Sequence, residues 1–203
     1  MRTGIPHHIG FIPDGNRRWA KERGLPKEEG YAFGIGPGLS LYERCRDMGV
    51  GEISIYGFTR DNTKRPTAQR QAFAKACVRY AEELSKRGAA LLVLGDDGSS
   101  AFPQELRVFR ERQGQGTKVN LLVNYGWDWD INGLKHGDLR SAAVSRLDLI
   151  VRWGGGRRLS GFLPIQSVYA DFFIVDAYWP DFEMEQFEAA LRWFRGQDPT
   201  LGG

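Results

Sequence analysis

Long apolar runs are absent from this sequence of 203 residues. None approaches the roughly 20 residues that a membrane-spanning helix needs. The start of the chain also lacks the apolar stretch of a secretory signal peptide. We therefore expect a cytoplasmic protein with no stable membrane insertion.

Cysteine and histidine are scarce, with two and three residues respectively. Cys45 and Cys77 lie far apart, with no C-x-x-C spacing and no histidine cluster nearby. This pattern excludes a disulfide framework and a zinc site of the usual spacing. We expect both thiols to be small buried side chains on helix faces. His7, His8 and His136 have no carboxylate or cysteine at a useful spacing, so we assign them no catalytic role.

An excess of one charge sign is also missing. The chain has 28 basic and 25 acidic residues, a net charge of +3, and opposite signs are interspersed along it. We therefore expect no nucleic-acid surface, although a local basic site for small anions remains compatible with the balance. Length and a hydrophobic content of 41% indicate one folded domain spanning 1–203.

Short apolar runs alternate with segments of helical spacing. The pattern predicts strands at 8–12, 53–58, 91–95, 119–123, 147–151 and 172–175, and helices at 17–22, 39–48, 73–88 and 184–194. Continuous apolar strands separated by helices predict an α/β fold with a mostly parallel sheet covered on both faces. Ligands of such sheets bind at the carboxyl ends of the strands, so the residues after each strand are candidates.

A carboxylate, a glycine turn and two arginines follow the first predicted strand, in the run 14–18. Asp14 is suited to Mg²⁺, which binds through one or two carboxylates plus substrate phosphates. Gly15 lets backbone N–H groups approach an anion, and Arg17 and Arg18 add charge-assisted hydrogen bonds. The alternative is that Asp14 only caps the following helix, since Asp is a favoured cap.

Two further loops carry polar groups after strands. The first, 58–66, contains Asn62 and Arg65. Taken alone, its sequence is typical of a solvated loop. The second, 152–160, has three glycines flanked by arginines and a serine, which suits a backbone nest for phosphate oxygens. It matches neither the Walker pattern nor G-x-G-x-x-G, and a flexible surface turn is the alternative.

Taken together, these segments resemble the cis-prenyltransferases, the family of undecaprenyl diphosphate synthase. The matching runs, in family order, are Asp14-Gly15-Asn16-x-Arg18-Trp19-Ala20, Phe58-Thr59-x-Asp61-Asn62-x-Lys64-Arg65-Pro66, Gly95-Asp96, Asn124-Tyr125-Gly126, Arg152-x-Gly154-Gly155-x-x-Arg158-Leu159-Ser160-x-Phe162, Tyr169-Ala170-Asp171 and Trp179-Pro180-Asp181-Phe182. They cover nearly the whole chain.

The resemblance implies a single α/β domain whose mostly parallel central sheet and surrounding helices enclose an elongated apolar tunnel. It also implies a homodimer, Mg²⁺ as cofactor and allylic isoprenoid diphosphates as substrates. Two diphosphate sites are expected in such an enzyme. The reaction would join the allylic carbon of one substrate to the double bond of the other.

The resemblance also assigns roles to residues. Asp14 and Asn62 would be catalytic, and Mg²⁺ would bind Asp14, with Asp171 in place of a family glutamate and reaching in from the other subunit. The expected substrate-binding residues are Gly15, Asn16, Arg17, Arg18, Trp19, Tyr31, Phe58, Thr59, Arg65, Arg152, Arg158 and Ser160. Residues 14–18 would hold the allylic diphosphate, and Arg152, Arg158 and Ser160 would hold the second substrate. Phe58 or Trp19 would stabilise the allylic cation.

The sequence departs from the family pattern at several residues that are expected to lie near the two substrates. Lys27 replaces an arginine and Tyr31 a histidine near the allylic diphosphate, while Thr63 replaces a tryptophan and Gly156 a glutamate. This pattern resembles the irregular, lavandulyl-type branch, which joins two allylic diphosphates head to middle. The expected substrates are dimethylallyl or geranyl diphosphate. The alternatives are a regular head-to-tail short-chain Z-prenyl synthase that uses isopentenyl diphosphate, and a non-catalytic partner subunit of a heteromeric transferase.

Overall fold

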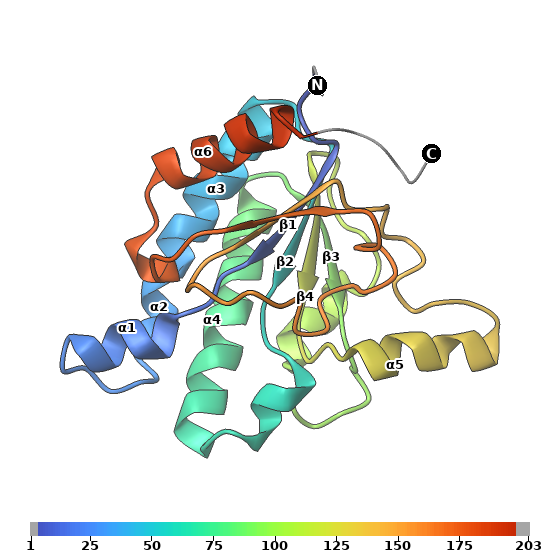
Figure 1. The fold of residues 1–203 in the computed structure, drawn as a ribbon. Coiled ribbons are helices and arrows are strands. Elements are labelled where there is room, and N and C mark those ends of the chain that lie inside the picture. Colours follow the sequence, from blue (N-terminus) through green and yellow to red (C-terminus); the bar gives the residue numbers. More distant parts are fainter. Residues whose placement is uncertain (1–3, 198–203) are drawn as a thin grey trace.

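A six-stranded parallel sheet forms the centre of the computed structural model, which describes residues 4–197 (Figure 1). Its strands are β1 (His8–Ile12), β2 (Glu52–Tyr56), β3 (Ala90–Leu94), β4 (Lys118–Leu122), β5 (Leu149–Arg152) and β6 (Asp171–Ile174). They lie in the order β3-β4-β2-β1-β5-β6, and each neighbouring pair is parallel. The predicted α/β class and parallel sheet are confirmed.

Helices cover one face of this sheet. The long helices α3 (Ile35–Asp47), α4 (Thr67–Lys86) and α6 (Met184–Arg195) pack there, with the short helices α1 (Asn16–Glu22) and α2 (Gly30–Phe33) beside the carboxyl end of β1 (Figure 1). Alternate strand residues such as Ile9 and Phe11 point into this apolar layer. Both cysteines are buried in it, as the sequence predicts.

Loops cover the second face, where the sequence alternation leads one to expect helices. Val144, Leu147, Phe162 and Leu163, from the connections on either side of β5, pack there against strand residues such as Ile150. The short helix α5 (Trp127–Ile131), continued by a 3₁₀ turn at Asn132–His136, lies to one side. The face is buried, but its cover consists of turns with separate backbone hydrogen bonds, such as that from the Ser167 N–H to the Leu163 carbonyl at 3.0 Å.

Two helices differ from the predicted boundaries for a local reason. α3 begins at Ile35, before the predicted start, and its first turn contains Gly36, Pro37 and Gly38. These residues carry no helical apolar pattern, although proline is tolerated in a first turn because its missing N–H is unpaired there anyway. α2 has only four residues, which is too short to show a period.

A cluster of buried polar side chains lies at the amino end of the sheet, on its second face. His8 Nε2 lies 2.9 Å from Ser54 Oγ, and the amide of Asn120 donates to Ser54 Oγ and Glu52 Oε1 at 3.0 and 2.6 Å. Ser145 Oγ donates to the other oxygen of Glu52 at 2.8 Å. Because the His8 ring is wholly buried, desolvation lowers its pKa below the ordinary value of 6.5.

We predict that acid weakens the fold through His8. Its folded pKa lies below its unfolded value, so below about pH 6.5 the unfolded chain binds a proton that the folded chain does not. The free energy of unfolding should fall by up to about 1.4 kcal/mol between pH 7.5 and 5.5 from this group. Urea titrations at both pH values measure it. His8→Gln should flatten the dependence, and His7→Gln, at an exposed position, should leave it unchanged; an equal slope in all three proteins would contradict the assignment.

Candidate active site

A cavity of about 460 Å³ opens at the carboxyl ends of β1, β2 and β5. Its volume is in the range of small-molecule sites, about 300–1,000 Å³. The lining residues are Ile12, Pro13, Asp14, Gly15, Asn16, Arg17, Arg18, Lys21, Lys27, Tyr31, Tyr56, Gly57, Thr59, Asp61, Asn62, Arg65, Phe73, Arg152 and Ser160. We call this cavity the basic chamber, because six of these side chains are lysine or arginine and only Asp14 and Asp61 are acidic.

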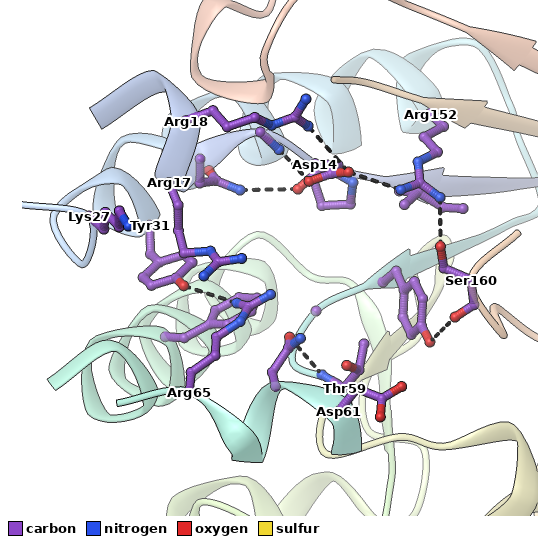
Figure 2. A pocket seen from close by; sticks show the side chains of 18 of the residues that line it. Asp14, Arg17, Arg18, Lys27, Tyr31, Thr59, Asp61, Arg65, Arg152 and Ser160 are labelled. Carbon is purple, nitrogen blue, oxygen red and sulfur yellow. Dashed lines mark hydrogen bonds and ion pairs between the residues drawn. The ribbon is translucent and has the colours of Figure 1, made fainter. Parts of the chain in front are cut away.

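Asp14 lies between two guanidinium groups at the wall of the chamber (Figure 2). Its Oδ2 is 2.9 Å from Arg152 Nη2 and 3.4 Å from Arg18 Nη2, and its Oδ1 accepts the Gly15 N–H at 2.6 Å. Gly15 has φ +104°, a left-handed conformation that favours glycine, and a Cβ there would lie 2.7 Å from the Tyr178 ring. The N-cap of α1 is Gly15 and no side chain caps the helix. The capping role considered for Asp14 is therefore not what the structure shows.

Tyr31 and Arg65 form the opposite wall of the chamber. Arg65 Nη1 donates to the Tyr31 hydroxyl at 3.0 Å, and the Tyr31 ring stacks on Phe73 with centroids 4.4 Å apart. Burial raises the pKa of Tyr31 above its ordinary value and lowers the pKa of Arg65 below its ordinary value. Because the phenol accepts from Arg65, its own hydrogen is free for an anion. Arg17 and Arg65 face the same space in Figure 2.

Asn62 lies on a short 3₁₀ turn, Arg60–Lys64, after β2. Its Oδ1 accepts the Thr59 N–H at 3.2 Å, in a capping box that holds the side chain in place. This bond uses the amide oxygen and leaves the NH₂ group as the donor that a ligand could use. The turn thus presents Asn62, Thr59 and Asp61 to the chamber.

Arg152 ends β5 and is 4% exposed. Its Nη1 donates to Ser160 Oγ at 2.9 Å and to the Arg158 carbonyl. Tyr56 Oη in turn donates to the Ser160 carbonyl at 2.9 Å. These hydrogen bonds fix the glycine-rich segment after β5 to β2 and β5. The alternative considered from the sequence, a flexible surface turn, therefore does not describe this segment.

The structure brings together most of the predicted residues. Asp14, Gly15, Asn16, Arg17, Arg18, Tyr31, Thr59, Asn62, Arg65, Arg152 and Ser160 all line the basic chamber. Lys21, Tyr56 and Phe73 line it too, although the sequence reasoning did not name them as site residues. Lys21 follows Arg17 by four residues and thus shares its helix face, a signal that could have identified it.

Four predicted residues lie outside the lining. Trp19 is buried and its indole N–H donates to Asp181 Oδ1 at 2.6 Å, while Phe58 is buried edge-on against Phe73. The Arg158 side chain is exposed. Asp171 begins β6 in register with Leu149, at the amino end of the sheet, whereas Asp14 follows its carboxyl end. Its approach from a second subunit stays a prediction.

A small apolar pocket adjoins the basic chamber on the helical side of the sheet. Its volume is about 70 Å³, and it shares Pro13, Asn16, Tyr31, Tyr56, Gly57 and Phe73 with the chamber. Tyr80 of α4 forms part of its wall, and the Tyr80 hydroxyl donates to the Gly38 carbonyl of α3 at 3.0 Å. The elongated tunnel that the resemblance implies stays a prediction.

The arrangement fits comparisons with known proteins. A family model described as putative undecaprenyl diphosphate synthase matches residues 12–136 and 132–202. The chain belongs to this cis-prenyltransferase family. It is therefore a prenyltransferase.

Curated cis-prenyltransferases match along nearly the whole chain. The ditrans,polycis-undecaprenyl-diphosphate synthase ((2E,6E)-farnesyl-diphosphate specific) of Pseudomonas putida is 31% identical, with coverage of 98% of this chain and 92% of that protein. The enzyme of the same name from Pectobacterium atrosepticum is 30% identical, covering 98% and 90%. An isoprenyl transferase of Clostridium perfringens is also 30% identical over the same shares.

Among solved structures, the fold is similar to lavandulyl diphosphate synthase from Lavandula x intermedia in complex with dimethylallyl diphosphate. The TM-score is 0.83, covering 98% of this chain and 99% of that one, at 22% identity. This likeness shows a shared cis-prenyltransferase fold.

The chamber's donor set fits a magnesium ion bound together with a diphosphate. Within residues 4–197, no three His, Cys, Asp or Glu side chains gather into a metal cluster. Mg²⁺ commonly binds through one or two carboxylates and completes its shell with phosphate oxygens and water. Asp14, 39% exposed beside the basic groups, meets that need. The described helices include none long and apolar enough to cross a membrane.

We predict that inorganic diphosphate binds the chamber without any divalent metal. At about 100 times its dissociation constant, such a ligand should raise Tm by about 5–10 °C for a chain of this size. Differential scanning fluorimetry measures the shift, which 0.5 M NaCl should reduce by screening.

Arg65→Met should weaken this binding about ten- to hundredfold, since a hydrogen bond to a charged group contributes about 1.5–3 kcal/mol. Arg44→Met is the matched control, because Arg44 pairs with Glu188 on the helical surface, away from the chamber. Equal Tm shifts in the two variants would show that the anion binds elsewhere.

Proposed function

We propose that this cis-prenyltransferase couples two short allylic diphosphates head to middle, with dimethylallyl diphosphate as the preferred donor and Mg²⁺ as cofactor. The observation that carries the proposal is the junction of the basic chamber with the small apolar pocket. A diphosphate and a short prenyl group need these two environments side by side. The polar and apolar parts share six lining residues.

The donor diphosphate would lie between α1 and the wall formed by Tyr31 and Arg65. Arg17, Arg18, Lys27 and Arg65 supply positive charge there, and the Tyr31 hydroxyl supplies a neutral donor. Charge-assisted hydrogen bonds of this kind are about twice as strong as neutral ones. The prenyl group would then point past Tyr31 and Phe73 into the apolar pocket.

The second diphosphate would bind against the hydrogen-bonded pair of Arg152 and Ser160. Beside it is another cavity, of about 510 Å³, which shares Tyr56, Thr59, Asp61 and Ser160 with the basic chamber. Thr63, which stands where the family carries a tryptophan, lines this cavity. The smaller side chain leaves lateral room for a second allylic group to present its middle carbon, which supports head-to-middle coupling.

The reaction requires breaking the donor's C–O bond and stabilising charge of both signs. As the bond breaks, Arg17, Arg18 and Arg65 hold the leaving diphosphate, and the faces of Tyr31, Tyr56 and Phe73 stabilise the allylic cation. When bound at Asp14, Mg²⁺ would supply Lewis-acid neutralisation of the diphosphate. The Asn62 amide would orient the second substrate. Two allylic diphosphates thus yield one branched diphosphate, inorganic diphosphate and a proton.

The size of the apolar pocket supports a five-carbon donor. Its volume of about 70 Å³ is well below the roughly 300–1,000 Å³ of sites for drug-sized ligands. Such a pocket favours a short prenyl group, with the diphosphate in the adjoining chamber.

Regular head-to-tail synthesis is the second candidate. It is favoured by the names of the relatives, several of which are undecaprenyl-diphosphate synthases specific for farnesyl diphosphate. The short pocket argues against such a donor here. A non-catalytic partner subunit is less consistent with a chamber that keeps Asp14, Asn62 and the arginines together.

Product analysis tests the proposal. Purified protein with Mg²⁺ and dimethylallyl diphosphate alone should form a branched ten-carbon diphosphate, identified by mass spectrometry and NMR. A linear Z-product that forms only when isopentenyl diphosphate is added would establish the regular synthase instead. No turnover of either mixture would favour the partner subunit.

A substitution at Tyr80 tests the donor length. We expect Tyr80→Leu to raise kcat/KM for geranyl relative to dimethylallyl diphosphate at least tenfold. The reason is that each newly buried methylene contributes about 0.8 kcal/mol and 1.4 kcal/mol is a factor of ten. Tyr42→Leu is the matched control, since Tyr42 is fully buried on α3 but does not line the pocket. If both variants keep the wild-type ratio, the wall at Tyr80 does not set donor length.

A further inference from the structure

The buried guanidinium of Arg152 connects the two proposed diphosphate subsites. One terminal nitrogen, Nη2, bonds Asp14 Oδ2 at 2.9 Å, and the other, Nη1, donates to Ser160 Oγ at 2.9 Å (Figure 2). Arg152 Nε is buried with no hydrogen-bond partner among the described residues. The Arg152 side chain is thus held by its two terminal nitrogens, and one of them contacts the carboxylate that would bind Mg²⁺.

The absence of a side chain at Gly156 leaves space for Arg152 in this position. A Cβ on residue 156 would lie 2.6 Å from Arg152 Nε and Nη2 and 2.7 Å from Cζ, closer than side-chain atoms approach one another. Gly156 is not among the glycines with positive φ. The backbone conformation at this position therefore does not require glycine. Glycine is needed here because a larger residue would take the space of the guanidinium.

A guanidinium and a metal ion on the same carboxylate oxygen repel each other, because both are positively charged. Arg152 neutralises Asp14 through Oδ2, so a cation at Oδ2 would be disfavoured by this repulsion unless Arg152 moved away. An incoming second diphosphate needs the same Arg152 donors. Since each binding event releases what the other requires, the two are coupled, and such coupling between sites is typically 5- to 150-fold.

We propose that the Arg152–Asp14 ion pair, made possible by Gly156, competes with the divalent cation, and that a diphosphate on Arg152 relieves this competition. Gly156 is then a positioning residue that makes metal binding depend on the second substrate. This inference rests on the proposed metal site at Asp14.

The test measures metal binding in the absence of any diphosphate, using Mn²⁺ as the probe and electron paramagnetic resonance to count the free ion. Arg152→Gln removes the competing charge, and Gly156→Ala pushes the flexible guanidinium off Asp14. Both should bind Mn²⁺ at least fivefold more tightly than wild type. Gly36→Ala, whose Cβ meets nothing within 4 Å, is the matched glycine control and should match wild type. Thermal melts confirm that each variant is folded.

The variant Asp14→Asn distinguishes a failure of the proposed competition from a failure of the proposed metal site. If it loses Mn²⁺ binding while Arg152→Gln and Gly156→Ala keep the wild-type dissociation constant, the competition is wrong and the metal site stands. If Asp14→Asn binds Mn²⁺ as wild type does, the metal site is wrong and the inference falls with it.

Discussion

Parallel pairing of β1 with both β2 and β5 is the constraint on which the site depends. It brings Ile12 into register with Arg152 and ends β2 at Tyr56 on the same edge. Whatever follows these strands must therefore meet at one place. Asp14, the turn that carries Asn62, and Arg152 come from segments far apart in the chain, yet they share one chamber because of this pairing.

Electrostatic balance in the chamber follows from that convergence. Six basic side chains surround two carboxylates, and the most buried of the six, Arg152, is paired with one of them. An isolated buried guanidinium would carry a large desolvation cost, which the carboxylate and the Ser160 hydroxyl offset. Of the other five cations, Arg18 also pairs with Asp14, at 3.4 Å. Anion binding and the stability of the apo protein therefore compete for the two arginines on Asp14.

Much of this fold could be predicted from the sequence, because continuous apolar strands of five residues and glycine stops are strong local signals. The chamber residues after β1, β2 and β5 were predicted from the rule that ligands bind at the carboxyl ends of parallel strands, together with the family resemblance. Taken alone, the segment 58–66 is typical of a solvated loop. Phe73 was not predicted, since its helical spacing marks it equally well as a core residue. Nor could Trp19 and Phe58 be placed, because the direction in which an aromatic ring points depends on tertiary packing. The depth of the apolar pocket likewise depends on Tyr80, whose contact with Gly38 joins two helices.

The two faces of the sheet are covered differently, so the two halves of the chamber, around Tyr31 and around Ser160, differ in how easily they open locally. Tyr31 stacks on Phe73 of α4 and accepts a hydrogen bond from Arg65. Ser160, in contrast, lies in the loop segment whose Leu159 and Phe162 help to cover the second face. Loop segments open locally at lower free energy than packed helices. The part of the chamber around Ser160 can therefore be reshaped by substitution without loss of the core, while changes around Tyr31 disturb helix packing. Under the proposed function, a scaffold of this kind lets the second substrate diversify in evolution while the donor remains fixed.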